Sequence, residues 1–256
     1  MISLLRTRRW LGFTAVVVTA ILLFGLLSLW QWQRADDKRE QRIELQNALA
    51  ATAQSLAEVA IVDGTIAPDD EWRHVTVSGT YVPGTEALVR KRSLDARNGF
   101  WTMTALATDD GRVVWINRGW IPTAGDALST PDIPVPPAGQ VDVTGYLRPY
   151  EEDTADPNAG LPAGQIAAVS PSALPSVDNA FPGYLQIEES VPAEDGPRAL
   201  PLPTVDESRN ISYAVQWLIF AAVAIGGWFF FLRREAIDDA RRNDASSPEA
   251  ERIEAL

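Results

Sequence analysis

The sequence contains no cysteine, a single histidine, His74, and two methionines, Met1 and Met103. The lack of cysteine excludes disulfide bonds, thiolate metal ligands and a cysteine nucleophile. One histidine cannot build a histidine-rich metal centre, and any Ser-His-Asp catalysis would have to use His74. This residue falls on the polar side of an alternating segment, opposite Val75 and Val77, so we interpret it as a structural residue.

Other signatures of catalysis are also absent. The sequence has no glycine-rich phosphate-binding loop, no G-x-S-x-G nucleophile elbow and no pair of carboxylates in apolar surroundings. The tails outside the two apolar runs described next are too short for a kinase or nucleotide-binding domain. We therefore predict that this protein is not an enzyme.

Two uncharged apolar runs lie near the ends of the chain, at residues 11–30 and 211–232. As helices, each matches a hydrocarbon core of about 30 Å. We expect a membrane protein with these parts: a cytoplasmic tail (1–10), a transmembrane helix (11–32), a helical extension or linker (33–62), an extracytoplasmic β-rich domain (63–209), a second transmembrane helix (210–232) and a cytoplasmic tail (233–256).

Basic residues outside the two runs predict the orientation. They are Arg6, Arg8 and Arg9 before the first run, and Arg233, Arg234, Arg241 and Arg242 after the second. The positive-inside rule therefore places both termini in the cytoplasm. The first run is longer than the apolar part of a signal peptide, and no Arg- and Ser-rich import leader precedes it. We expect an uncleaved anchor in a bacterial plasma membrane. The net charge of −12 argues against a nucleic-acid partner.

In the central domain, the spacing of apolar residues changes from a helical pattern to the alternation that is typical of β-strands. Residues 34–60 lack Gly and Pro and predict a continuation of the first helix, ending near Asp63-Gly64. Alternating apolar residues then predict strands at 73–82, 86–92, 99–108, 112–118, 140–148 and 184–188. Asp109-Asp110-Gly111 predicts a hairpin turn, and residues 121–139 and 149–183 predict Pro-rich loops. The expected fold class is α+β, with an antiparallel β-sheet or partial barrel carried on two transmembrane helices.

Polar and aromatic residues gather where each run meets the extracytoplasmic side. On the first helix they are Trp30, Gln31, Arg34 and Lys38; on the second they are Asn210, Tyr213, Gln216, Trp217 and Phe220. Each set shares one arc of a helix. One explanation is an aromatic belt with Arg34 extending to the interface. The other is a contact site for a partner or haem, which Gln216 favours because a polar group inside an apolar run seeks a hydrogen-bond partner.

A second distinctive string, Arg118-Gly119-Trp120-Ile121-Pro122, stands at a predicted strand end. Gly119 permits a sharp change of direction and Pro122 ends the strand. Together with Tyr81, these residues form either a structural corner or a docking site for a partner. The pattern leaves both alternatives open.

These pieces together resemble the Surfeit locus protein 1 family of cytochrome c oxidase assembly factors. The motifs are Trp30-Gln31-x-x-Arg34 with Lys38, Glu71-Trp72-Arg73-x-Val75-x-Val77-x-Gly79-x-Tyr81, Gly99-Phe100, Val114-Trp115-Ile116-Asn117-Arg118-Gly119-Trp120-Ile121-Pro122, and Tyr213-Ala214-x-Gln216-Trp217. The resemblance implies a factor that helps haem a reach the catalytic subunit of the haem-copper oxidase. The implied partners are that subunit, the haem a synthesis machinery, or both, together with membrane lipid.

One position departs from the family pattern. Relatives often carry a histidine where this chain has Asn210, and asparagine is not a usual haem ligand. Neither apolar run contains His, Met or Cys, which leaves Tyr213 as the one ligand of a usual type. We expect no permanently bound cofactor and at most a transient contact with haem a. A lasting accessory subunit of the oxidase and an unrelated envelope scaffold are the alternatives.

The predicted topology can be tested with single cysteines, because the chain has no thiol of its own. Cysteines at positions 64 and 160 should react with a membrane-impermeant reagent in intact cells with the outer membrane permeabilised, and one at position 245 should react only after lysis. Labelling at position 245 alone in intact cells would reverse the orientation.

Overall fold

The computed structural model describes residues 5–59, 61–62, 64–123, 130–152, 158 and 160–245. The chain forms two compact units. One consists of Met1–Ile43 with Thr204–Leu256, and the other of Glu44–Pro203. Each unit is described by itself below.

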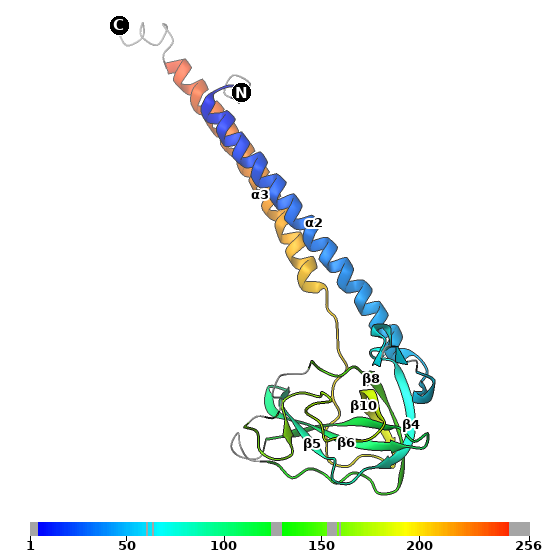
Figure 1. The fold of residues 1–256 in the computed structure, drawn as a ribbon. Coiled ribbons are helices and arrows are strands. Elements are labelled where there is room, and N and C mark those ends of the chain that lie inside the picture. The colour runs from blue at the N-terminus through cyan, green and yellow to red at the C-terminus, as the bar shows by residue number, and fades with distance from the viewer. Residues whose placement is uncertain are drawn as a thin grey trace, which may run out of the picture. The chain divides into compact units, whose positions relative to one another are not determined.

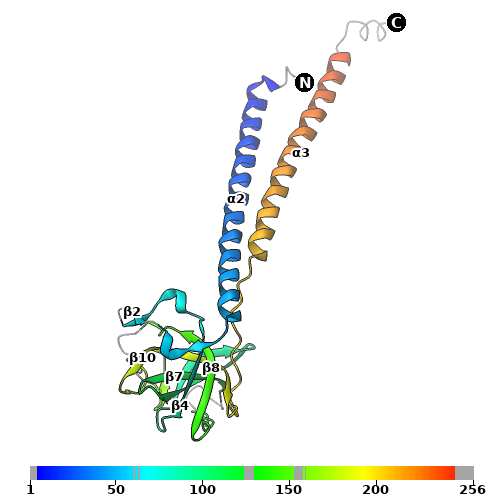
Figure 2. The ribbon, with the colours of Figure 1, turned by 90° about the vertical axis from the view of Figure 1, so that its right-hand side faces the viewer.

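The first unit consists mainly of two long helices, α2 (Arg8–Ala50), whose last residues belong to the second unit, and α3 (Ser208–Ala245). Both contain a stretch long and apolar enough to cross a membrane, with mean hydropathies of 2.3 and 2.0. The helices lie side by side in opposite directions, so that the start of α2 and the end of α3 share one end of the pair (Figures 1 and 2). The carboxylate of Asp206 accepts a hydrogen bond from the Ser208 backbone N–H at 2.9 Å and so caps α3.

The contact between the helices follows a seven-residue period. The less exposed residues of α2 include Trp10, Thr14, Val17, Ile21, Phe24, Ser28, Gln31 and Ala35. Those of α3 include Asn210, Ala214, Trp217, Ala221, Ala224 and Trp228. We call these residues the seam. Spacings that alternate between three and four are typical of helices packed as in a coiled coil.

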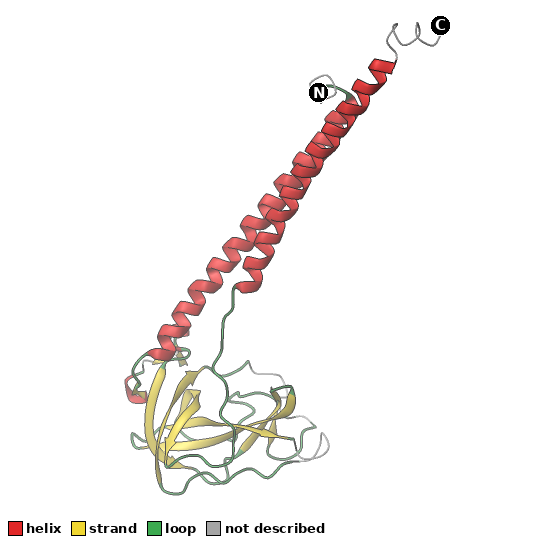
Figure 3. Cartoon of the chain, turned by 180° about the vertical axis from the view of Figure 1, so that it is seen from behind, coloured by secondary structure: helices red, strands yellow, loops and turns green. Residues whose placement is uncertain are grey.

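The second unit contains a small closed barrel. The ring consists of β4 (His74–Tyr81), β8 (Gln140–Arg148), β10 (Ala180–Val191), β7 (Val113–Pro122) and β6 (Arg97–Thr108). Pairing of β4 with β6 closes this ring. Figure 3 shows the strands of this unit in yellow. Closure requires a close approach at Gly79, because a Cβ atom there would lie 2.2 Å from the Ala107 carbonyl oxygen. The expected partial barrel is therefore closed by hydrogen bonds.

Shorter strands extend this sheet. β5 (Ala87–Leu94) pairs with β6, β9 (Gln165–Ile166) with β5, and β1 (Gln54–Ser55) with β4. A separate pair is formed by β2 (Ile61–Val62) and β3 (Thr65–Ile66). The expected hairpin at 109–111 is confirmed by the Thr108 N–H, which donates to the Arg112 carbonyl at 2.9 Å. The Pro-rich loop expectations lie partly outside the described residues, at 124–129, 153–157 and 159.

The expectation of an antiparallel sheet was wrong in part, because the sheet is mixed. β10 runs parallel to β7, β1 parallel to β4, and β9 parallel to β5. The β7–β10 pair forms because the long segment after β8 lets the chain return beside β7 in the same direction. Alternation of apolar residues predicts a strand but says nothing of the direction of its neighbour.

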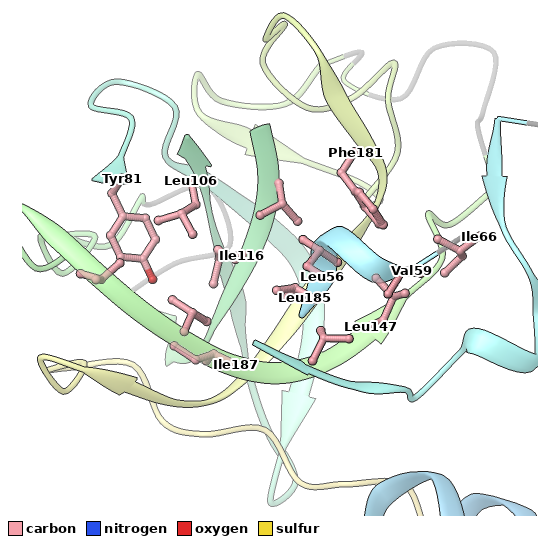
Figure 4. Packing of buried hydrophobic residues seen from close by; sticks show 14 residues of the cluster. Leu56, Val59, Ile66, Tyr81, Leu106, Ile116, Leu147, Phe181, Leu185 and Ile187 are labelled. Atoms are coloured by element: carbon pink, nitrogen blue, oxygen red, sulfur yellow. The ribbon is translucent and has the colours of Figure 1, made fainter. Parts of the chain in front are cut away.

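The predicted continuation of the first helix to about residue 60 is longer than the observed one. α2 ends at Ala50, and a short 3-10 helix follows at Leu56–Glu58. The side chains of Leu56 and Val59 are buried in the barrel core, at 2% and 5% exposure (Figure 4). Burial of these two apolar side chains draws the segment into the barrel, which a straight helix would not allow.

Candidate functional site

A buried charge cluster ties β7 to the loop after β10. The Arg118 side chain is fully buried, and its Nε and Nη2 donate to the two carboxylate oxygens of Glu194 at 2.9 and 2.6 Å. Its Nη1 donates to the carbonyl oxygen of Pro134 at 2.7 Å. The Tyr81 hydroxyl donates to Glu194 at 2.9 Å. Every donor atom of Arg118 named here therefore has an acceptor inside the protein, which a buried guanidinium requires.

The backbone beside this cluster holds a strap of residues 192–203. Trp120 and Arg198 exchange two backbone hydrogen bonds of 2.8 Å. Gly119 has a φ of +130°, and a Cβ atom there would lie 2.4 Å from the Arg198 carbonyl oxygen. Gly119 is thus needed both for its backbone conformation and for the approach of the strap.

Burial favours the structural alternative for this string. The Trp120 side chain is 1% exposed, and its indole N–H donates to the Arg92 carbonyl at 2.8 Å. Arg118 and Tyr81 are also buried, and Pro122 is the exposed last residue of β7. Sequence reasoning did not identify Glu194 and Pro134, because nothing in a loop sequence indicates which distant arginine it will meet.

The surroundings of Tyr81 raise the pKa of its hydroxyl group. Burial raises the pKa of the Tyr81 hydroxyl, and the Glu194 carboxylate raises it further, while Arg118 acts in the opposite direction. Burial likewise raises the pKa of Tyr146 and that of Tyr150, each to about 12, with the Glu188 carboxylate adding to the effect at Tyr146. These phenols are protonated at neutral pH and act as hydrogen-bond donors.

Both ring nitrogens of His74 lie close to oxygen atoms of the protein. Its Nδ1 lies 3.0 Å from the Ala51 carbonyl oxygen, and its Nε2 lies 2.8 Å from a carboxylate oxygen of Glu188. The imidazole stacks on Tyr146 at 4.9 Å between ring centroids, and the Tyr146 hydroxyl donates to the same Glu188 carboxylate. The histidine joins the chain just beyond α2 to β4 and β10, which agrees with the structural interpretation.

The residues expected at the helix ends divide into two groups. Gln31 and Trp217 lie in the seam: the Asn210 amide N–H donates to Gln31 Oε1 at 3.0 Å, and Trp217 stacks on Phe24 at 5.6 Å. Trp30, Arg34, Tyr213 and Gln216 are exposed on the helix pair. We call these four residues the outer face.

Helix geometry places the whole outer face on one side of the pair. Each of its residues immediately precedes a seam residue, namely Gln31, Ala35, Ala214 or Trp217. One step back along a helix is a rotation of about 100°. In two antiparallel helices that face each other, the same backward step turns both toward the same side. The structure therefore brings these side chains to one surface.

The outer face has polar groups without partners. Within the described part of the chain, neither the Arg34 guanidinium nor the Gln216 amide makes an ion pair or a hydrogen bond. In contrast, several polar seam residues are paired: Ser28 donates to the Ala214 carbonyl at 3.0 Å, and Trp228 donates to Thr14 at 3.0 Å. The free groups are thus available to another molecule.

The helices do not fit the ligation of haem iron. Neither α2 nor α3 contains His, Met or Cys, and the amide of Asn210 is already bonded to Gln31. Tyr213 offers the one remaining oxygen of a usual ligand type, from an exposed position. The barrel has an apolar cavity of about 520 Å³ that is lined by residues such as Ile66, Trp115 and Phe181. No described His, Lys, Arg, Asp or Glu lines this cavity.

Comparison with known proteins gives one consistent family. A model of the SURF1 family matches residues 18–222. Uncharacterized SURF1-like proteins of Mycobacterium tuberculosis and Mycobacterium bovis are 30% identical over 251 residues, covering 93% of this chain and 89% of each relative. A SURF1-like protein of Monosiga brevicollis is 26% identical over 254 residues, covering 87% and 88%. The resemblance inferred from the sequence motifs is confirmed.

The raised pKa of Tyr81 predicts a loss of stability at alkaline pH. Below about pH 10 the tyrosine is protonated in both folded and unfolded protein. Above it, only the unfolded chain releases this proton, so the free energy of unfolding falls by up to about 1.4 kcal/mol per pH unit. Urea unfolding of the full-length protein in detergent, followed by tryptophan fluorescence from pH 9 to 11, should show a smaller slope for Tyr81→Phe than for wild type. The control Tyr213→Phe should keep the wild-type slope, and an unchanged slope in Tyr81→Phe would contradict this account.

Proposed function

Because the chain belongs to the SURF1 family, whose members are generally cytochrome oxidase assembly factors and not enzymes, we propose that it assists maturation of the haem-copper cytochrome c oxidase. In this proposal it helps haem a enter the catalytic subunit. The protein performs no catalysis of its own and acts by binding and positioning.

The proposed arrangement has both helices in the plasma membrane, both termini in the cytoplasm and the barrel on the extracytoplasmic side. Two long apolar helices and the arginines at their shared end support it. The outer face then lies near the extracytoplasmic boundary of the membrane, where an oxidase subunit can reach it within the bilayer.

The observation that carries the proposal is the unpartnered chemistry of the outer face. In hydrocarbon, the Gln216 amide gains from a hydrogen bond to another helix or ligand. The Arg34 guanidinium can pair with a carboxylate, such as that of a partner subunit or a haem propionate. The rings of Trp30 and Tyr213 are exposed on the same side of the helix pair. Together they form a surface for an amphipathic partner.

The proposed role toward haem a follows from which side chains of the helices could coordinate iron. The helices have no usual nitrogen or sulfur ligand for iron, so the iron ligands come from the partner subunit. The outer face contributes contacts to the periphery of the haem or to the subunit that receives it. Because the outer face provides no iron ligand in this proposal, its contact with haem is transient. We expect that the purified protein retains no haem.

Deletion of the gene tests the proposed function. The deletion strain should lose haem a absorbance and oxidase activity in membranes, while other respiratory complexes keep their activity. Reduced-minus-oxidised spectra and separate activity assays give the readout. Normal haem a content in the deletion strain would overturn the proposal, and copurification of the protein with mature oxidase in equal amounts would favour a lasting accessory subunit.

Variants of the outer face test its role in the same strain. Arg34→Lys keeps the charge but loses the planar fork, so oxidase activity should fall although the protein inserts. Gln216→Leu should insert at least as well as wild type, because it removes a polar group from hydrocarbon, yet oxidase recovery should be impaired. Immunoblots of membranes control for protein level, and Leu218→Ile, which changes an exposed apolar residue of α3, is the matched control. Full recovery of oxidase activity by both variants would mean that these residues only position the helices at the membrane interface.

A further inference from the structure

A groove lies between the first turn of α2 and the C-terminal part of α3. It has a volume of about 320 Å³ and is lined by Arg9, Trp10, Phe13, Phe231 and Glu235. The rings of Trp10 and Phe13 meet edge to face at 5.6 Å, and those of Phe13 and Phe231 at 6.3 Å. The groove thus has aromatic walls and a charged rim.

The rim is strongly basic. Arg9 pairs with Glu235 at 3.2 Å, and its side chain stays 80% exposed. Four more exposed arginines flank the same end, Arg6, Arg8, Arg233 and Arg234, and none of them has an ion pair with a described residue. Farther along α3, Arg242 pairs with Asp239. Arg9 and these four arginines outnumber the nearby carboxylates Glu235 and Asp238. The excess of positive charge favours an anionic occupant.

One of the residues that line the groove has a donor without an acceptor. Trp10 is 4% exposed, and its indole N–H has no hydrogen-bond partner among the described residues. A buried donor left unpaired costs about 1–3 kcal/mol. An ester or phosphate oxygen entering the groove after a small side-chain shift would supply the missing acceptor.

The position of these groups along the helices matches the layers of a bilayer. Trp10 immediately precedes the apolar run 11–30, and Phe231 lies in the last turn of the apolar run 211–232. The aromatic walls therefore continue toward hydrocarbon, and the arginines stand at the depth of the headgroups.

We propose that this groove binds an anionic phospholipid of the cytoplasmic leaflet. The phosphate lies among the arginines and within reach of Trp10, and an acyl chain follows Phe13 and Phe231. A zwitterionic phosphatidylcholine fits less well, because its choline cation meets an excess of positive charge. This inference rests on the membrane-spanning arrangement proposed above and is independent of the role in oxidase assembly.

Native mass spectrometry of the full-length protein in a mild detergent tests the site. The protein is incubated with equal amounts of phosphatidylglycerol and phosphatidylcholine of the same acyl chains, and retained lipids are counted. Wild type should retain phosphatidylglycerol preferentially. Equal retention of the two lipids by wild type would overturn the proposal.

Variants locate the lipid in the groove. The double change Arg8→Gln with Arg234→Gln leaves the Arg9–Glu235 pair intact and should weaken retention of phosphatidylglycerol about fivefold for each arginine. Trp10→Phe keeps a ring but loses the N–H, and should also weaken retention. Arg39→Gln removes an exposed arginine of α2 far from the groove and is the matched control. Wild-type retention by both groove variants would contradict the site, and a loss in Arg39→Gln equal to that in the double variant would show general attraction and overturn it.

The outcome is separable from that of the proposed function. Lipid retention is measured on purified protein, and oxidase content plays no part in it. A deletion strain with normal haem a would therefore leave the lipid site standing. Release of the wild-type protein from membranes by alkaline carbonate would remove the membrane arrangement and the lipid site together.

Discussion

The buried guanidinium of Arg118 constrains much of the barrel unit. A positive charge withdrawn from water must be neutralised and fully hydrogen-bonded, and removal of one partner of such a pair costs about 3–5 kcal/mol. Here the partners come from two loops, at Glu194 and Pro134. The strap must therefore return to β7, and Gly119 provides the backbone space for it. The ion pair thus holds the strap against β7.

The helix pair follows the same rule with weaker interactions. Three polar contacts cross the seam, Asn210–Gln31, Ser28–Ala214 and Trp228–Thr14. Such pairs fix the register of two helices in an apolar medium, where a polar group left alone is costly. Gln216 and Arg34 have no such partner among the described residues. The contrast between these paired seam groups and the unpaired groups of the outer face is the physical reason to assign contact with another molecule to that face.

Local signals in the sequence predicted the local features of the fold. Alternation located β4 and β8 nearly to the residue, and Asp109-Asp110-Gly111 specified the β6–β7 hairpin. Contacts between distant segments had no such signal. The parallel pairing of β7 with β10 depends on how a long segment returns, and the end of α2 at Ala50 depends on burial of Leu56 and Val59. Similarly, the string at 118–122 was identified as distinctive, but its partner Glu194 could not be predicted.

Residue 210 bears both on the packing of the two helices and on the proposed function. The resemblance implies a histidine there in many relatives, whereas in this chain the Asn210 amide is used to join α3 to α2 through Gln31. An amide in this role joins the two helices, and neither helix then offers iron a usual nitrogen or sulfur ligand. An assembly factor must also release what it helps to deliver. Contacts made through an exposed arginine, an amide and two aromatic rings are individually worth about 0.5–2 kcal/mol, which suits binding that a receiving subunit with strong iron ligands can replace. The chemistry of this chain therefore favours positioning of the oxidase subunit or of the haem periphery over storage of haem.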